Sequence, residues 1–177
     1  KRDWSSDVCS SDLLVAYEEE MDEKQSDEIL VTAEKANSIL VIEDNEELLH
    51  LMTKLLRHEY NVFTAENGKE GIAVLENEDI DLIVSDVMMP EMDGMEFCKY
   101  VKGKLEISHI PVILLTAKNK EEDRAEAYEV GADAFISKPF NLSVLHARIR
   151  NLLKYKERMA HEFKKQLVFE LKDLNYT

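Results

Sequence analysis

Short apolar runs alternate with segments of helical periodicity along most of the chain. Four of the runs are almost wholly apolar and cover residues 39–42, 82–85, 112–115 and 134–137. A fifth run, residues 60–66, alternates apolar and polar positions, which is typical of a strand covered on one face. Apolar residues spaced three and four positions apart follow the runs, as expected for helices with one buried face. Repeated strand and helix units of this kind predict a parallel sheet.

The expected fold class is α/β, a flavodoxin-like doubly wound sheet of five parallel strands in the order 2-1-3-4-5, with a C-terminal helical extension. The wholly apolar runs fit central strands covered on both faces, so residues 60–66 fit an edge. Asn45 is placed to cap the first helix, and Gly131 to end the fourth in a left-handed conformation. Helices are expected over residues 68–78 and 121–130. Three more are expected around sets of apolar residues, which are Leu48, Met52 and Leu55 in the first, Met95, Phe97, Cys98 and Val101 in the second, and Leu142, Leu145, Ile149, Leu152 and Leu153 in the third.

The first 37 residues differ from the rest in composition. Residues 1–12 repeat a Ser-Ser-Asp element and resemble a translated sequencing adapter, so we expect them to be an artefact. Residues 18–28 are a charge run with little apolar surface to bury, which favours a linker, although a solvated helix face is the alternative. We therefore expect residues 1–37 to be a disordered segment with an acidic linker, and residues 38–153 to form the folded domain.

The C-terminal residues 154–177 predict a helical linker that continues the last helix. Apolar positions at Ile149, Leu152, Met159 and Phe163 lie near seven-residue spacing, with Lys156 as an interruption. Such a pattern fits either a dimer seam or a connector to a downstream module.

Charge and composition exclude several classes of function. The net charge of -15 argues against direct nucleic-acid binding by this chain, because such binding depends on Lys and Arg that neutralise phosphates. No apolar run approaches the roughly 18 residues that a membrane-spanning helix needs, so we expect a cytoplasmic protein without a membrane segment. Cys9 and Cys98 are the two cysteines, and their number and spacing favour free thiols over a disulfide framework or a metal site.

Polar side chains follow the predicted central strands at the points where these strands end. Glu43 and Asp44 follow the first strand, whereas Asp86, Thr116 and Lys138 follow the third, fourth and fifth. Because ligands of open parallel sheets bind outside the carboxyl ends of the strands, we expect these five side chains to share one crevice. The crevice would bind a cation and a phosphoryl group.

Each of these residues also has a plainer interpretation. A carboxylate or a threonine before a helix is often an N-cap, and a lysine before a proline is often a surface residue. Three carboxylates in one crevice, however, repel one another, and a divalent cation with oxygen ligands relieves that repulsion. Mg²⁺ binds through a few carboxylates and keeps several waters, so it suits this small set better than Ca²⁺ does.

The chain from residue 38 to residue 153 resembles the receiver domains of bacterial two-component response regulators. The resemblance rests on four motifs in order, IEDNEE, SDVMMPEMDG, LLTAK and the Lys-Pro-Phe element at residues 138–140. It implies that Asp86 accepts a phosphoryl group from a kinase phosphohistidine, with Mg²⁺ as cofactor. Asp44 and Asp86 would bind the metal directly, the carbonyl of Met88 would add a ligand, and Glu43, where the family more often has Asp, would reach it through water.

The resemblance also implies roles for the remaining residues. Lys138 would pair with the phosphoryl group, aimed inward by a cis Lys138-Pro139 bond, and Thr116 would donate its hydroxyl to the same group. Movement of Thr116 would let Phe135 turn inward and alter the face formed by residues 121–130, 134–137 and 142–153. A plain core phenylalanine is the alternative for Phe135. In the family, residues at the places of Met88 and Lys118 tune autodephosphorylation, and this pair predicts a long-lived phosphorylated form.

An acidic linker before the domain and a basic tail after it resemble hybrid histidine kinases of the Bacteroidetes type, in which a receiver joins a kinase core to an AraC-type DNA-binding module. Regulation of transcription would then be the output, and homodimers could form through the face named above or through the C-terminal helix. His161 lies in a short string similar to the kinase phosphohistidine motif, but a solvated helix residue is favoured there. Two rival functions are an aspartyl phosphohydrolase, weakened by Met88 in the place of a second acid, and an unphosphorylated interaction module. The leading interpretation is a phosphoacceptor switch that is not an enzyme beyond self-phosphorylation and slow self-dephosphorylation.

Overall fold

The computed structural model describes residues 37–117, 125 and 128–174, and side-chain surroundings up to residue 169. The chain divides into two units, residues 1–34 and residues 35–177, and the first lies outside the described residues. The predicted disordered segment at residues 1–37, apart from its last residue, and most of the helix expected at 121–130 therefore lie outside the described part. Within the second unit the fold is α/β.

The sheet has five parallel strands in the order β2-β1-β3-β4-β5, which confirms the predicted topology. Each predicted run became a strand with bounds that differ by no more than one residue from the prediction. The strands are β1 (Ser38–Ile42), β2 (Asn61–Ala65), β3 (Leu82–Asp86), β4 (Val112–Thr116) and β5 (Ala134–Ser137). β1, β3 and β4 are almost entirely buried, whereas β2 at one edge is partly exposed, as the alternating pattern of residues 60–66 indicated.

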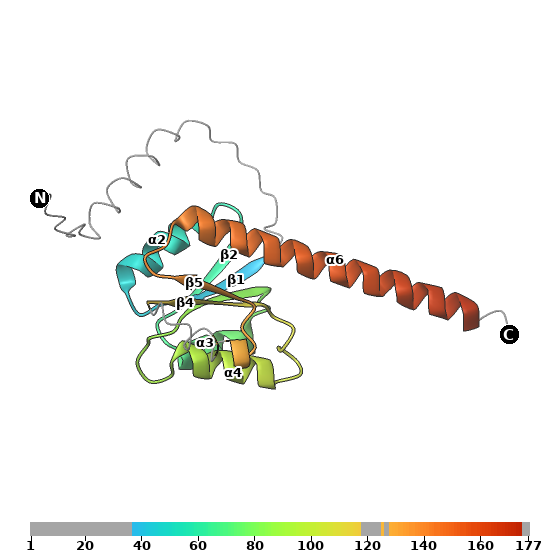
Figure 1. Ribbon diagram of the computed structural model, residues 1–177, viewed down its shortest axis with the longest axis horizontal. Coiled ribbons are helices and arrows are strands. Elements are labelled where there is room, and N and C mark those ends of the chain that lie inside the picture. The colour runs from blue at the N-terminus through green and yellow to red at the C-terminus, as the bar shows by residue number, and fades with distance from the viewer. Residues whose placement is uncertain (1–36, 118–124, 126–127, 175–177) are drawn as a thin grey trace, which may run out of the picture. The chain divides into compact units, whose positions relative to one another are not determined.

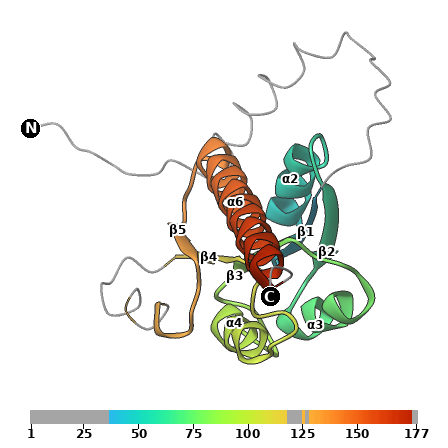
Figure 2. The same cartoon turned by 90° about the vertical axis from the view of Figure 1, so that its right-hand side faces the viewer.

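Helices cover both faces of the sheet. Figure 1 and Figure 2 show α2 and α6 on one face and α3 and α4 on the other. The helices are α2 (Glu46–Leu56), α3 (Gly68–Asn77), α4 (Gly94–Gly103) and α6 (Leu142–Leu174). This arrangement is the doubly wound fold, and it brings the carboxyl ends of all five strands to one edge of the sheet.

Short side-chain caps fix where the helices begin. The Asn45 side chain accepts a hydrogen bond from the N–H of Leu48 at 3.1 Å, which confirms its predicted capping role. Gly131 has a φ of +84°, the left-handed conformation predicted for it. The buried side of α2 is turned slightly from the predicted one, because Met52, Thr53 and Leu56 are its buried residues whereas Leu48 and Leu55 are half-buried.

The last helix is longer than the domain that it covers. α6 runs without interruption for 33 residues and packs on the sheet through its first part, where Leu142, Leu145, Ile149 and Leu153 are buried. From Glu157 to Phe169 every side chain is exposed. Among the described residues, no helix is both long and apolar enough to cross a membrane.

Candidate functional site

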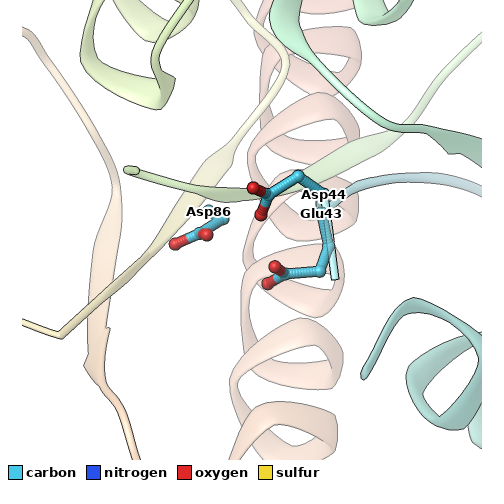
Figure 3. Close-up of side chains that lie close together, drawn as sticks. All are labelled: Glu43, Asp44 and Asp86. Atoms are coloured by element: carbon cyan, nitrogen blue, oxygen red, sulfur yellow. The ribbon is translucent and has the colours of Figure 1, made fainter. Parts of the chain in front are cut away.

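The polar residues predicted to converge do lie together at the carboxyl edge of the sheet. Glu43 and Asp44 follow β1, and Asp86 is the last residue of β3, next to β1 in the sheet. One carboxylate oxygen from each of the three acids lies within 4.8 Å of the others. Figure 3 shows the three carboxylates grouped at the ends of their strands. Neighbouring parallel strands thus build an acidic cluster from residues that are 43 positions apart in the sequence.

Lys138 joins this cluster from β5, the far edge of the sheet. Its ammonium Nζ lies 2.8 Å from Oε2 of Glu43 and 3.2 Å from Oδ2 of Asp86. The side chains of Glu43 and Asp86 are 1% and 7% exposed, and that of Lys138 is 23% exposed. The peptide bond between Lys138 and Pro139 is cis, as the resemblance implied. One partly buried ammonium therefore bridges two buried carboxylates.

The burial of these charges perturbs their proton affinities. Burial raises the pKa of Glu43, the nearby charge of Asp86 adds to this effect, and the hydrogen bond from Lys138 opposes it. For Lys138, burial lowers the pKa, but the hydrogen bond to Glu43 and the charges of both carboxylates outweigh burial and leave the pKa raised. The cluster carries more negative than positive charge, because Asp44 adds a third carboxylate that is exposed to solvent.

The first residues of α4 hold the loop that follows Asp86. Asp93 is the N-cap of α4 and forms a capping box with Glu96, whose N–H donates to Oδ1 of Asp93 at 2.8 Å. Gly94 is the first residue of α4, and its N–H donates to the carbonyl of Val87 at 2.9 Å. A Cβ at Gly94 would lie 2.1 Å from the backbone oxygen of Asp86. Only glycine allows α4 to begin this close to Asp86.

Thr116 and Phe135 occupy the places that the sequence indicated, on neighbouring strands. Thr116 is buried at the end of β4, and its carbonyl accepts a hydrogen bond from the N–H of Lys138 at 2.7 Å. Phe135 in β5 is half-buried, and its ring meets that of Tyr128 edge-on with centroids 5.0 Å apart. A backbone hydrogen bond therefore joins Thr116 to Lys138. Phe135 lies between the core and the exposed ring of Tyr128.

The two residues predicted to tune dephosphorylation are Met88 and Lys118. Met88 lies two positions after Asp86 and is 59% exposed. Lys118 lies outside the described residues. Their expected effect on the lifetime of a phosphorylated form remains a prediction.

The acidic cluster has the chemistry of a site for a hard divalent cation. All of its donors are carboxylate oxygens, which Mg²⁺ prefers, and two oxygens bound to one Mg²⁺ lie roughly 3–4 Å apart. The 4.8 Å limit on the distances between the three oxygens needs only small side-chain movements to meet this spacing. Both oxygens of Glu43 are already engaged, by Lys138 Nζ at 2.8 Å and by the N–H of Asn45 at 3.2 Å. The residues therefore fit Mg²⁺, with Asp44 and Asp86 freer to bind it than Glu43.

Sequence reasoning missed the roles of Gly94, Asp93 and Glu96 in holding the loop after Asp86. A usable signal was present, because Asp-Gly-Met-Glu has an N-cap residue followed three positions later by glutamate, just before an apolar helix. The close approach of Gly94 to the Asp86 carbonyl has no local signal, since it depends on how α4 packs beside β3.

The comparisons with known proteins agree with this geometry. The family model of the response regulator receiver domain matches residues 39–150. The signal receiver domain of a signal transduction histidine kinase from Syntrophus aciditrophicus has 38% identity and a TM-score of 0.64 over 67% of this chain and 91% of that one. A CheY-like receiver domain protein from Methanospirillum hungatei has 29% identity and a TM-score of 0.65 over 70% of this chain and 98% of that chain.

Curated relatives are longer than this chain. Histidine kinase P4 of Formosa agariphila is 39% identical over 89% of this chain, which spans only 12% of that protein. The transcriptional regulatory protein PhoP of Bacillus subtilis is 39% identical over 67% of this chain and 49% of its own length. The family match covers more than half of the chain and coincides with the folded domain that carries the acidic cluster. The chain therefore belongs to the response regulator receiver domain family of two-component signal transduction.

Proposed function

We propose that this chain is a phosphoacceptor switch in which Asp86 takes a phosphoryl group from a phosphohistidine of a histidine kinase. A carboxylate oxygen of Asp86 forms the new bond to phosphorus, and the bond from phosphorus to the imidazole nitrogen breaks. The imidazole leaves with the bonding electron pair and takes up a proton. The observation that carries the proposal is the bridge from Lys138 to both Glu43 and Asp86, with the Asp44 carboxylate beside them.

Each residue of the cluster has a distinct task in this proposal. Asp44 and Asp86, with the backbone carbonyl of Met88, would hold Mg²⁺, and Glu43 would act through water. When bound, Mg²⁺ offsets the negative charge that gathers on the transferring oxygens. The ammonium of Lys138 lies 3.2 Å from Asp86 Oδ2, so it can form an ion pair with a phosphoryl oxygen once Asp86 is phosphorylated. Thr116, buried on the neighbouring strand, would donate its hydroxyl to the same group.

Incubation of the chain with acetyl phosphate and Mg²⁺, followed by intact mass measurement, tests the proposal. We expect a stable gain of one phosphoryl group, absent in Asp86→Asn and in samples with excess chelator. Asp93→Asn is the matched control, because this acid lies in the same loop and asparagine also caps helices. Continuous release of phosphate would support the hydrolase instead, and absence of any mass gain would support the unphosphorylated interaction module.

The Mg²⁺ assignment can be tested separately by titration calorimetry. We expect Asp44→Asn to weaken Mg²⁺ binding by at least tenfold, because it removes an exposed donor of the cluster. Glu47→Gln changes charge equally in the first turn of α2 and should leave binding within a factor of three. Equal losses in the two variants would show that only the general negative field attracts the ion.

The signal would leave the site through Thr116 and Phe135. A movement of Thr116 toward the phosphoryl group would let the Phe135 ring turn away from Tyr128, which it now meets at 5.0 Å. This change would alter the face that the resemblance assigns to residues 121–130, β5 and residues 142–153, where a partner or a second copy would bind. NMR of the Tyr128 ring during phosphorylation should show a shift that Phe135→Leu abolishes while Asp86 is still phosphorylated. An unchanged shift in Phe135→Leu would leave Phe135 as a plain core residue.

The lifetime and the context of the switch are further parts of the proposal. A long-lived phosphorylated form is expected, because Met88 and Lys118 would hinder an in-line water, and decay within seconds would contradict this. The parent protein would be a hybrid histidine kinase with a DNA-binding output, and residues 154–177 would be the linker to that module. The 39% identity to a histidine kinase of which this chain spans 12% supports the kinase part of this proposal. The open reading frame on both sides of this chain decides the point.

A further inference from the structure

Ser85 is a fully buried polar residue next to Asp86 in β3. It is 0% exposed, and its neighbours in the sheet are Ile42 on β1 and Leu114 on β4. Side chains two positions apart share one face of a strand, and Ile83 belongs to the core cluster that includes the buried residues of α4. The Ser85 hydroxyl therefore lies on the face covered by α4, where burial of a polar group costs free energy unless a hydrogen bond compensates it.

The Ser85 hydroxyl compensates its burial with a bond to the backbone beside the acidic cluster. Its Oγ donates to the carbonyl of Asp86 at 3.0 Å. The same peptide group is held at its other end, because the N–H of Val87 donates to the carbonyl of Leu115 at 2.9 Å. The next peptide group is held as well, since the carbonyl of Val87 accepts from the N–H of Gly94 at 2.9 Å. Two successive peptide groups after the Asp86 side chain are thus tied to their surroundings.

The Asp86 carbonyl lies in a crowded place between β3 and α4. A Cβ on Gly94 would lie 2.1 Å from this oxygen, so the first residue of α4 already touches it. A contact from a glycine Cα is at best a weak hydrogen bond, whereas a hydroxyl is a strong donor. Ser85 supplies this donor from within the strand. An apolar side chain at residue 85 would leave the oxygen with a weaker partner and the peptide group freer to rotate.

We propose that Ser85 is a positioning residue for phosphorylation, whose hydroxyl fixes the Asp86–Val87 peptide group so that the Asp86 carboxylate and the Met88 carbonyl face one cation. This inference rests on the proposed function of Asp86. The Asp86 side chain leaves the backbone before this peptide group and the Met88 carbonyl comes after it, so a rotation of the group moves one oxygen relative to the other. Ser85 touches neither the phosphoryl group nor the cation and acts through the backbone alone.

Amide hydrogen exchange of the full 177-residue chain, without Mg²⁺ or phosphodonor, tests whether the hydroxyl holds the peptide group. We expect Ser85→Ala to speed exchange of the Val87 N–H at least tenfold. Ile83 is the internal control, because its N–H donates to the carbonyl of Pro111 at the other end of β3, also at 2.9 Å. Its exchange should change less than threefold. Equal changes at the two amides would show only a general loss of stability and would overturn the inference.

The kinetics of phosphorylation by acetyl phosphate at saturating Mg²⁺ test the functional part. We expect Ser85→Ala to lower the maximal rate at least tenfold and to change the half-saturating concentration of acetyl phosphate less than threefold, because the hydroxyl does not contact the phosphodonor. Thr53→Val is the matched control, since it removes another buried hydroxyl, one without a partner among the described residues, and should leave both values within twofold. A wild-type maximal rate in Ser85→Ala would overturn the inference.

A second pair of variants separates the hydroxyl from the size of the side chain. Ser85→Thr and Ser85→Val have the same shape, but only threonine can donate a hydrogen bond. We expect the threonine variant to keep the phosphorylation rate and the Val87 exchange within threefold of the wild type, and the valine variant to resemble Ser85→Ala. Equal rates in the two folded variants would overturn the role of Ser85. If the wild type itself takes up no phosphoryl group, the proposed function of Asp86 fails instead.

Discussion

Replacement of Lys138 by methionine should destabilise the metal-free protein strongly at neutral pH. The side chain keeps its length, but its ammonium no longer compensates Glu43 and Asp86, which are 1% and 7% exposed. Loss of one partner of a buried ion pair costs about 3–5 kcal/mol. Because Lys138 is itself 23% exposed, water screens part of the interaction, and we expect a loss of about 3 kcal/mol. For a unit of this size that loss lowers the Tm by roughly 10 °C.

The pH dependence of this loss follows from the two raised pKa values. Glu43 has a raised pKa in the folded protein, chiefly because of burial, so its contribution to stability is full below its unfolded pKa and is lost as pH rises through its folded pKa. Lys138 also has a raised pKa, so its contribution persists through neutral pH and is lost only as pH rises through its folded pKa. The difference in the free energy of unfolding between the wild type and Lys138→Met should therefore be large at pH 7. It should become smaller as the pH falls and Glu43 binds a proton.

Urea unfolding in the presence of a chelator measures the effect. Lys69→Met is the control, because Lys69 and Glu91 form an ion pair at 3.2 Å with side chains 64% and 56% exposed, and such surface pairs contribute about 0–1 kcal/mol. Adding Glu43→Gln to Lys138→Met should restore about half of the loss, since it removes one of the two uncompensated charges. If Lys138→Met costs no more than Lys69→Met, or costs the same at pH 7 and pH 4, the bridge does not hold the cluster together.

Three further predictions concern the loop after Asp86, a helix and the free thiol. Gly94→Ala should cost about 2–3 kcal/mol and slow phosphorylation, because its Cβ would lie 2.1 Å from the Asp86 backbone oxygen, whereas Gly103→Ala, with nothing within 4 Å, should be neutral or stabilising by up to about 1 kcal/mol in urea unfolding. Thr53→Val should raise the free energy of unfolding by about 1 kcal/mol, since Thr53 Oγ1 is buried without a partner among the described residues, and any loss above about 1 kcal/mol would contradict this. Burial raises the pKa of Cys98 to about 11, so in a Cys9→Ser chain a thiol reagent at pH 8 should modify Cys98 at least 100-fold more slowly when folded than in urea.

The strands could be predicted almost to the residue because their signal is local. Buried parallel strands need near-continuous apolar runs, and the polar residue that ends each run marks the edge where the site forms. The resemblance to the family suggested the roles that we propose for Asp86 and Lys138, which strand position alone does not give. The buried face of α2 was harder to predict, because leucines lie all around that helix and one of its buried residues is a polar threonine. The spacing of the apolar residues therefore placed the centre of the buried face near Leu48 and Leu55 instead of near Leu56.

Pairings between distant segments could not be predicted. The sequence placed Lys138 near the acids, but not that its ammonium would lie closer to Glu43, at 2.8 Å, than to Asp86, at 3.2 Å. Nor did it indicate that Lys156 would hold α6 to Asp81, 75 positions away, because Lys156 read only as an interruption in an apolar pattern. Such contacts depend on the angle at which a helix crosses the sheet, which the local pattern of residues does not encode.

Charge is balanced at one edge of the sheet and unbalanced at the other. At the amino ends of the strands, Asp81 accepts from the N–H of Ser38 at 2.9 Å and pairs with Lys156, and Asp133 accepts from a backbone N–H and pairs with Lys102 at 2.8 Å. Each of these acids has its own ammonium. At the carboxyl ends, one ammonium serves two buried carboxylates and a third acid lies beside them.

This difference has a functional consequence. The balanced edge holds the fold and has no electrostatic need for another ion, so binding of a cation there would gain little. The unbalanced edge keeps carboxylates close together against their mutual repulsion, and it depends on the rest of the fold to do so. A divalent cation would relieve that repulsion, so Mg²⁺ should stabilise the wild type against urea. Mg²⁺ should stabilise Asp44→Asn much less, because that variant starts with less repulsion to relieve and one donor fewer.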